Sequence, residues 1–123
     1  MRIYLDACIW IDVLEKRHPE TIKLLNSIDE MTIIVSPLLI KEISGVGYPE
    51  KHVRKMFRHH AMANITRTQL QEARIVARKR KLPFHDALHA IIAKDNGAAI
   101  ITRDRHFLRL RDVVEVIMPE VSS

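Results

Sequence analysis

The chain has 123 residues, of which 47% are hydrophobic and 28% charged, a composition that is typical of globular proteins and excludes disordered or fibrous ones. One domain over residues 1–123 is the simplest organisation, and the apolar runs are far shorter than the ~20 residues of a membrane helix. The formal net charge of +5 is uneven, because residues 1–50 hold 5 Lys and Arg against 8 Asp and Glu, whereas residues 51–123 hold 15 against 7. A basic half favours a polyanionic partner such as nucleic acid, although solvated basic surfaces look the same.

The first half of the chain predicts strands that alternate with helices. In chain order we expect a strand at 2–5, helices at 9–14 and 19–28, a strand at 31–35 and a helix at 36–45. Ser36 followed by Pro37 is a strong helix start. Ile9, Trp10 and Val13 recur at helical spacing and are expected in the core or in a dimer interface.

The second half continues the alternation. We expect a basic helix at 47–60, a weak strand at 61–67, helices at 69–81 and 85–96, and strands at 98–102 and 113–117. Thr68 and Gln71 have the spacing of a capping box, and Gly97 suits a helix C-terminus. This alternation predicts an α/β fold with a parallel central sheet of about five strands and helices on both faces.

Four acidic residues are expected to meet at one edge of this sheet. Asp6 and Asp104 follow strands, Glu42 lies in a helix that begins where a strand ends, and Asp86 begins a helix that leads back into the next strand. In a parallel sheet all these positions lie at the carboxyl ends of the strands, where ligands bind. Asp12 and Asp95 do not share this placement and are expected on the solvated surface.

Clustered carboxylates repel one another unless a cation offsets their charge. Hard oxygen ligands favour Mg²⁺ or Mn²⁺, either of which can activate water and stabilise charge on a phosphoryl oxygen. The four acids therefore predict a metal site suited to phosphodiester hydrolysis. Singly, each acid also has an ordinary explanation as a helix-end, turn or surface residue.

Two histidines in residues 82–97 offer an alternative metal. His85 and His89 lie four residues apart, as in zinc-binding H-E-x-x-H helices. The residue after His85 is Asp86 rather than Glu, no third zinc ligand follows at a recognisable spacing, and oxygen ligands do not select zinc. We therefore expect no zinc site, and we expect His89 either to touch a phosphate or to make a surface hydrogen bond.

Four segments of the chain carry a resemblance to a known family. YLDACIWIDVLE (4–15), SPLLIKEI (36–43), FHDALHA (84–90) and ITRDRHF (101–107) have the order and spacing of PIN domains. They look most like the toxin ribonucleases of VapBC toxin–antitoxin pairs. The resemblance covers nearly the whole chain.

The resemblance implies that the metal ligands are Asp6, Glu42, Asp86 and Asp104, and that Thr102 supports them through its hydroxyl. It implies Mg²⁺- or Mn²⁺-dependent RNA cleavage that leaves 5′-phosphate and 3′-hydroxyl ends, a homodimer, and inhibition by a cognate antitoxin protein. The family's pattern often has Asn, Ser or Thr where this chain has Cys8, and a thiol is a poor partner for a hard metal shell.

Further expectations concern the substrate and the cell compartment. Arg103 and Arg105 flank Asp104 and are candidates for binding a backbone phosphate. Cys8 is the one cysteine, so it cannot form an internal disulfide, which suits the cytoplasm, and its apolar surroundings predict an inert thiol. The N-terminal residues show no signal-peptide pattern.

The rival hypothesis is a non-catalytic RNA-binding or regulatory α/β domain. A phosphoacceptor receiver would need two adjacent acids after the first strand and a lysine after the last. Residues 4–8 contain one acid, which disfavours a receiver. Retention of all four acids favours an active enzyme.

Overall fold

The sheet contains five parallel strands in the order β3-β2-β1-β4-β5. The structure is a computed structural model and describes residues 1–119. The strands are β1 (Arg2–Leu5), β2 (Thr32–Val35), β3 (Ala61–Met62), β4 (Ala99–Ile101) and β5 (Val116–Ile117). The helices are α1 (Ala7–Glu15), α2 (Pro19–Asn26), α3 (Pro37–Gly45), α4 (Glu50–Phe57), α5 (Arg67–Arg80), α6 (Phe84–Asp95) and the 3-10 helix η1 (Arg105–Leu110).

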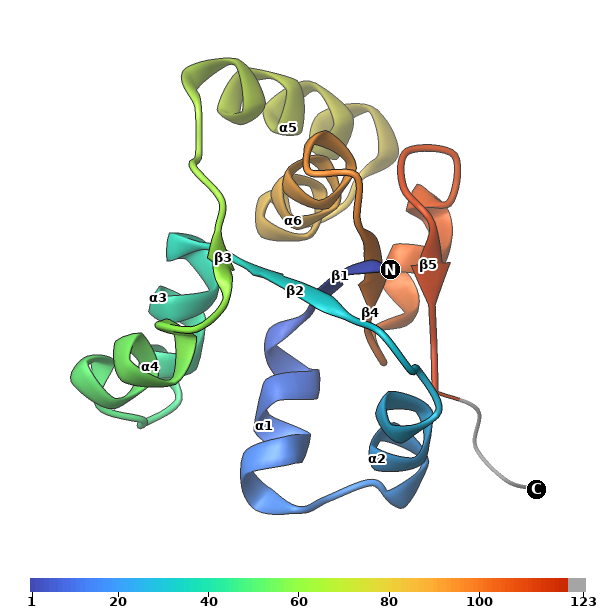
Figure 1. The fold of residues 1–123 in the computed structure, drawn as a ribbon. Helices are drawn as coiled ribbons and strands as arrows, with labels where there is room; N and C mark the ends of the chain where they lie inside the picture. Colours follow the sequence, from blue (N-terminus) through green and yellow to red (C-terminus); the bar gives the residue numbers. More distant parts are fainter. Residues whose placement is uncertain (120–123) are drawn as a thin grey trace.

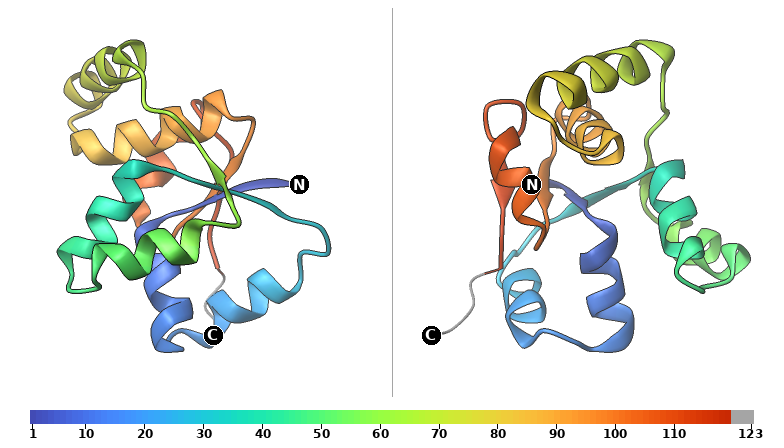
Figure 2. Two further views of the ribbon diagram at one scale, coloured as in Figure 1. Left: turned by 60° about the vertical axis from the view of Figure 1, so that its left-hand side comes forward. Right: turned by 180° about the vertical axis from the view of Figure 1, so that it is seen from behind.

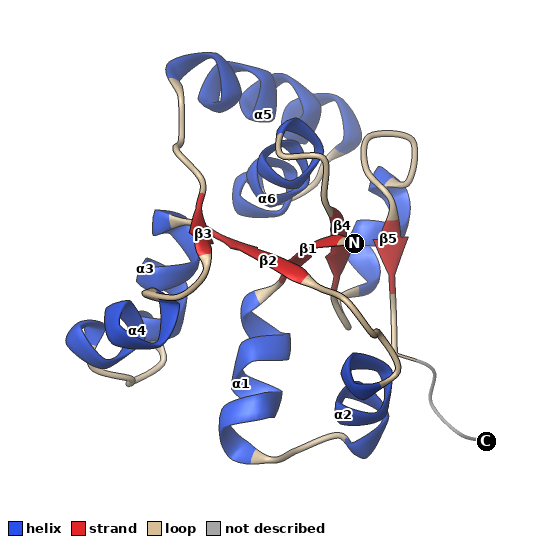
Figure 3. Cartoon of the chain, viewed as in Figure 1, coloured by secondary structure: helices blue, strands red, loops and turns tan. Residues whose placement is uncertain are grey.

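Helices cover the sheet on opposite sides. Figure 1 shows α5 and α6 above the sheet and α1 and α2 below it, with α3 and α4 side by side near the β3 edge. The two turned views in Figure 2 keep this arrangement. Figure 3 shows the strands enclosed by helices. The predicted parallel α/β sheet is therefore confirmed.

The centre of the sheet is also the centre of the core. β1 lies between β2 and β4, and its Tyr4 pairs in register with Ile34 and Ile100. All three side chains are buried. Strands buried on both faces read as continuous apolar runs rather than as alternating ones, which is why the short run at the start of the chain predicted a strand.

Helix α3 is positioned by a local signal in the sequence. Ser36 accepts a hydrogen bond from the backbone N–H of Leu39, and Pro37 occupies the first helical position, as predicted. This start fixes α3 directly after β2 and therefore brings Glu42 to the carboxyl end of that strand.

Two local expectations were wrong. The capping box of α5 is formed by Thr66 and Gln69, two residues before the predicted pair, Thr68 and Gln71, so the helix begins at Arg67. The strand expected at 61–67 has only two residues. Of the residues expected in the core or in a dimer interface, Ile9 and Trp10 are buried, with Trp10 against Phe57, whereas Val13 is 40% exposed on the outer face of α1.

Within residues 1–119, no helix combines the length and the apolar character that crossing a membrane requires.

Candidate active site

The four predicted acids come together at the carboxyl edge of the sheet. They form two neighbouring clusters, each with a histidine. Oxygen and nitrogen atoms of Asp6, Glu42 and His89 all lie within 4.8 Å of one another. The same is true of Asp86, Asp104 and His106. Residues distant in sequence therefore share one edge, as the parallel topology predicted.

Asp6 is held by both of its carboxylate oxygens. Its backbone N–H donates to the carbonyl of Ile101, which fixes the residue beside β4. One carboxylate oxygen accepts from the N–H of Ala7 at the start of α1, at 2.8 Å. The other accepts from the hydroxyl of Thr102, at 2.7 Å. Thr102 thus orients this carboxylate, and its hydroxyl also accepts from the N–H of Asp104.

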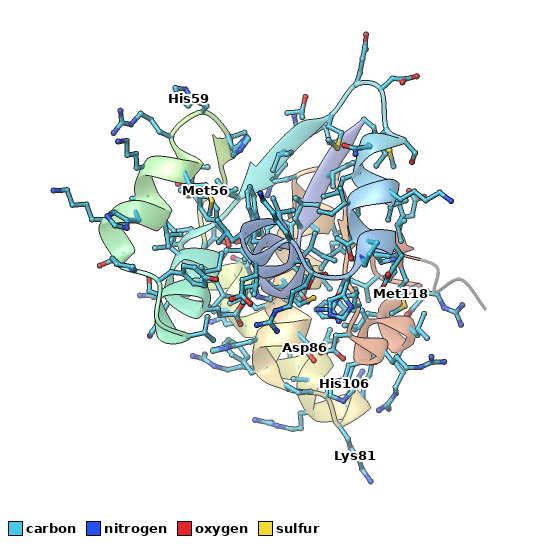
Figure 4. All side chains as sticks on the ribbon, turned by 90° about the horizontal axis from the view of Figure 1, so that it is seen from below. Met56, His59, Lys81, Asp86, His106 and Met118 are labelled. Carbon is cyan, nitrogen blue, oxygen red and sulfur yellow. The ribbon has the colours of Figure 1, made fainter. Side chains whose placement is uncertain are left out.

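The second cluster joins α6 to the loop after β4. Asp86 lies in the first turn of α6, and Asp104 caps η1 by accepting from the N–H of His106. His106 Nδ1 is 3.1 Å from Asp86 Oδ2 and 3.4 Å from Asp104 Oδ1. In Figure 4, Asp86 and His106 lie next to each other, with Lys81 beyond them. The histidine therefore connects two acids that the sequence places far apart.

The neighbouring negative charges in this site disfavour the ionised form of its carboxylates. The pKa of Asp86 is raised by burial and then by the charges of Asp104 and Asp6, against the lowering effect of His106. Repulsion that spans both clusters is relieved when a cation binds. The donor set consists mainly of carboxylate oxygens, which fits a hard divalent ion such as Mg²⁺ or Mn²⁺.

Glu42 is held by a buried histidine. His89 Nε2 lies 2.6 Å from Glu42 Oε1, and His89 Nδ1 lies 2.6 Å from the hydroxyl of Tyr4. The Tyr4 hydroxyl lies 2.7 Å from Ser36 Oγ. The expectation that His89 makes a surface hydrogen bond was wrong, because only 1% of His89 is exposed. His85 Nδ1 lies 3.5 Å from Glu42 Oε2 and is exposed.

Arg103 and Arg105 have different environments. Arg103 donates twice to Asp12, with Nε 2.7 Å from Oδ2 and Nη2 2.9 Å from Oδ1. Asp12 is 1% exposed and also accepts from Thr21, so its expected place on the surface was wrong. Asp95 is exposed, as expected. Arg105 is exposed beside Asp104.

Cys8 lies at the position where the sequence departs from the resemblance. Its Sγ is 3.6 Å from Asp6 Oδ2 and 3.8 Å from Thr102 Oγ1. Burial, followed by the charge of Asp6, raises the pKa of the thiol to about 11. The thiol is therefore neutral at physiological pH and is a weak donor to Asp6.

Three contributing residues were not predicted from the sequence. Tyr4 is the one polar side chain among the three buried residues of β1, and a buried tyrosine hydroxyl needs a partner, which was an available signal. His106 lies within the segment 101–107, but nothing in its spacing indicated Asp86. The pairing of Asp12 with Arg103 had no local signal, because the two residues are 91 positions apart.

Comparison with known proteins gives two kinds of match. The model of the PIN domain family matches residues 3–113, a range that contains all four acids. A sequence comparison with curated proteins finds no match.

Solved structures share the fold over nearly their full lengths. A toxin–antitoxin complex from Klebsiella pneumoniae matches with a TM-score of 0.75 at 19% identity, covering 98% of this chain and 99% of that one. VapBC2 from Rickettsia felis, bound to a promoter DNA fragment, matches with 0.74 at 15% identity, covering 98% and 100%. VapBC-1 from nontypeable Haemophilus influenzae matches with 0.70 at 18% identity, covering 96% and 98%. The family model and the shared architecture agree, and the chain belongs to the PIN domain family.

Proposed function

We propose that this protein is a Mg²⁺- or Mn²⁺-dependent endoribonuclease and the toxin of a toxin–antitoxin pair. The observation that carries the proposal is the convergence of Asp6, Glu42, Asp86 and Asp104 at one edge of the sheet, within the segment that matches the PIN family. PIN domains are generally nucleases. The similarity to solved toxin–antitoxin complexes supports the biological role.

The residues of the site have different proposed roles. Asp6, Glu42, Asp86 and Asp104 would hold the metal, and Thr102 keeps the Asp6 carboxylate in place through its hydroxyl. A bound divalent ion would lower the pKa of a coordinated water and stabilise charge on a phosphoryl oxygen. Arg105, exposed next to Asp104, would bind the phosphate of the RNA backbone. Arg103 is committed to Asp12 and would act by fixing the loop that carries Asp104.

The test is cleavage of total cellular RNA by the purified protein with Mg²⁺, with Mn²⁺ and with a chelator. We expect cleavage with either metal, none with the chelator, and 5′-phosphate ends on the products. Asp6→Asn should abolish cleavage. Asp29→Asn is the matched control, because Asp29 is exposed in the loop before β2, at the opposite edge of the sheet. RNA binding without cleavage by the wild type would instead support the non-catalytic alternative.

The partner and assembly are part of the same proposal. We expect a homodimer that acts in the cytoplasm and is inhibited by a small antitoxin encoded by a neighbouring reading frame. Co-expression with that frame should yield a co-purifying complex without ribonuclease activity, and light scattering should give the dimer mass. Ribonuclease activity that is unchanged in the presence of the protein encoded by the neighbouring frame would contradict the toxin–antitoxin role.

A further inference from the structure

A chain of buried hydrogen bonds runs from the backbone of α3 through the sheet to the active site. It links the Leu39 N–H to Ser36 Oγ at 3.3 Å, Ser36 Oγ to the Tyr4 hydroxyl at 2.7 Å, and Tyr4 to His89 Nδ1 at 2.6 Å. His89 Nε2 then reaches Glu42 Oε1 at 2.6 Å. Ser36 and Tyr4 are fully buried.

All hydrogen bonds of this chain are satisfied in only one donor-to-acceptor direction. A backbone N–H can only donate, so Ser36 Oγ accepts from Leu39. Within residues 1–119 the Ser36 hydroxyl has one other hydrogen-bond partner, the Tyr4 hydroxyl, so its proton has an acceptor only if Ser36 donates to Tyr4. Tyr4 must then donate to Nδ1 of His89, and His89 donates from Nε2 to Glu42.

The reverse direction leaves a buried group unsatisfied. If Nδ1 carried the proton, Tyr4 would accept from His89 and donate to Ser36. The Ser36 proton would then have no acceptor although Ser36 is fully buried, and an unsatisfied buried donor is costly.

We infer that Tyr4 and His89 are positioning residues for Glu42, and that this one-way hydrogen-bond chain keeps the His89 proton on Nε2. In that tautomer Nε2 has no lone pair for a metal, although it lies near Asp6 and Glu42 in the geometry of a ligand. His89 therefore holds Glu42 Oε1 by donation and leaves metal binding to the carboxylates. The role assigned to Glu42 rests on the proposed function, whereas the tautomer does not.

The first test reads the tautomer directly. Long-range ¹H–¹⁵N correlation spectra of the metal-free wild type report which imidazole nitrogen carries the proton, and the His89→Gln spectrum identifies the His89 signals. We expect the proton on Nε2, with Nδ1 accepting from the Tyr4 hydroxyl. A proton on Nδ1 would overturn the inference. This measurement does not require an active enzyme. The variant serves only to assign the His89 signals, so it does not need to keep the wild-type site.

The second test measures Mn²⁺ affinity by calorimetry and by electron paramagnetic resonance. Residues that orient metal ligands affect affinity by roughly 10- to 100-fold, so Tyr4→Phe and His89→Leu should weaken Mn²⁺ binding within that range. His89→Gln, whose amide can donate from the position of Nε2, should recover most of the affinity. Tyr48→Phe is the control, because the Tyr48 hydroxyl contacts exposed Glu15 and no site residue.

The outcomes separate the competing roles. If His89 were itself a ligand, His89→Gln would bind Mn²⁺ as poorly as His89→Leu, and Tyr4→Phe would bind nearly as well as the wild type. Circular dichroism and thermal midpoints check that each variant is folded. A wild type that binds no Mn²⁺ would contradict the proposed function, whereas an Nδ1 proton in an active enzyme would contradict only this inference.

Discussion

Arg103 and Asp12 form a bidentate ion pair that joins the loop after β4 to the middle of α1. Asp12 is 1% exposed and Arg103 about one-third exposed. Thr102 and Asp104, the neighbours of Arg103, both belong to the site. The pair therefore fixes the backbone between two residues of the candidate site.

Removing this pair should destabilise the fold. Arg103→Ala leaves Asp12 buried without its main cation, and loss of one partner of a fully buried pair costs roughly 3–5 kcal/mol. Because Arg103 is partly solvated, we expect about 2–3 kcal/mol in chemical denaturation. Arg105→Ala, at an exposed position, is the control and should change the free energy of unfolding by less than about 0.5 kcal/mol. Equal stabilities of the two variants would mean that the pair does not anchor the loop.

Asp86→Asn should lose activity and gain stability. The pKa of Asp86 is raised by burial and by Asp104, so its charged form costs folding free energy at neutral pH. The amide removes that cost and also removes a proposed metal ligand, so cleavage should fall by orders of magnitude while the thermal midpoint of the metal-free protein rises.

The sign of the pH dependence follows from the raised pKa. The stability advantage of Asp86→Asn should be present above the folded-state pKa of Asp86. It should disappear as the pH falls below the unfolded-state value, where the wild-type side chain is neutral in both states. Thermal scans of both proteins across acidic and neutral pH measure this difference in thermal midpoint. A midpoint that is lower for the variant at neutral pH would show that Asp86 is stabilising.

Zinc should be absent from the purified protein, because carboxylates dominate the site and His89 donates to one of them. Elemental analysis should find less than stoichiometric zinc, and His85→Ala should leave the Mg²⁺ requirement unchanged. His89→Ala is not a clean test of zinc binding, because it would also leave Glu42 without its hydrogen-bond partner. One zinc per chain that is lost in His85→Ala would restore the two-histidine interpretation.

The basic residues near the site should differ in their contribution to RNA binding. In an inactive Asp86→Asn background, Arg105→Gln should reduce the slope of log affinity against log salt by about 0.7, the value for one phosphate of a single strand. Arg80 pairs with Asp112, so the exposed set for comparison is Arg78, Lys79 and Lys81. We expect neutralising that set to change the slope little, because cations at a helix C-terminus also interact favourably with the helix dipole.

A surface hollow along α4 provides a second comparison for that experiment. It measures about 760 Å³ and is lined by Glu50, Lys51, His52, Arg54, Lys55 and Arg58. None of the four acids lines it. If neutralising Lys51, Lys55 and Arg58 lowers the salt slope while Arg105→Gln does not, the RNA path follows α4.

The sequence was sufficient for features that depend on local patterns. The four acids could be placed because Asp6 and Asp104 follow strands, Asp86 begins a helix, and Glu42 lies in a helix that begins where a strand ends. Parallel topology brings such positions together. Asp12 could not be placed, because its burial depends on a partner 91 residues away. The direction of hydrogen bonds through Tyr4 and His89 also required the packing of β1 against α6, which no spacing reveals.

The strand order has a consequence for protein synthesis. β1 emerges from the ribosome first, yet one of its two neighbours in the sheet is β4, and the site is completed only by Thr102 and Asp104. A nascent chain that has not reached these residues lacks the hydroxyl that orients Asp6 and one of the four carboxylates. Since domains fold as units during synthesis, a partly translated chain holds an incomplete candidate site. Under the proposed function, this late completion would keep a ribonuclease that is made beside messenger RNA inactive until its fold is nearly finished.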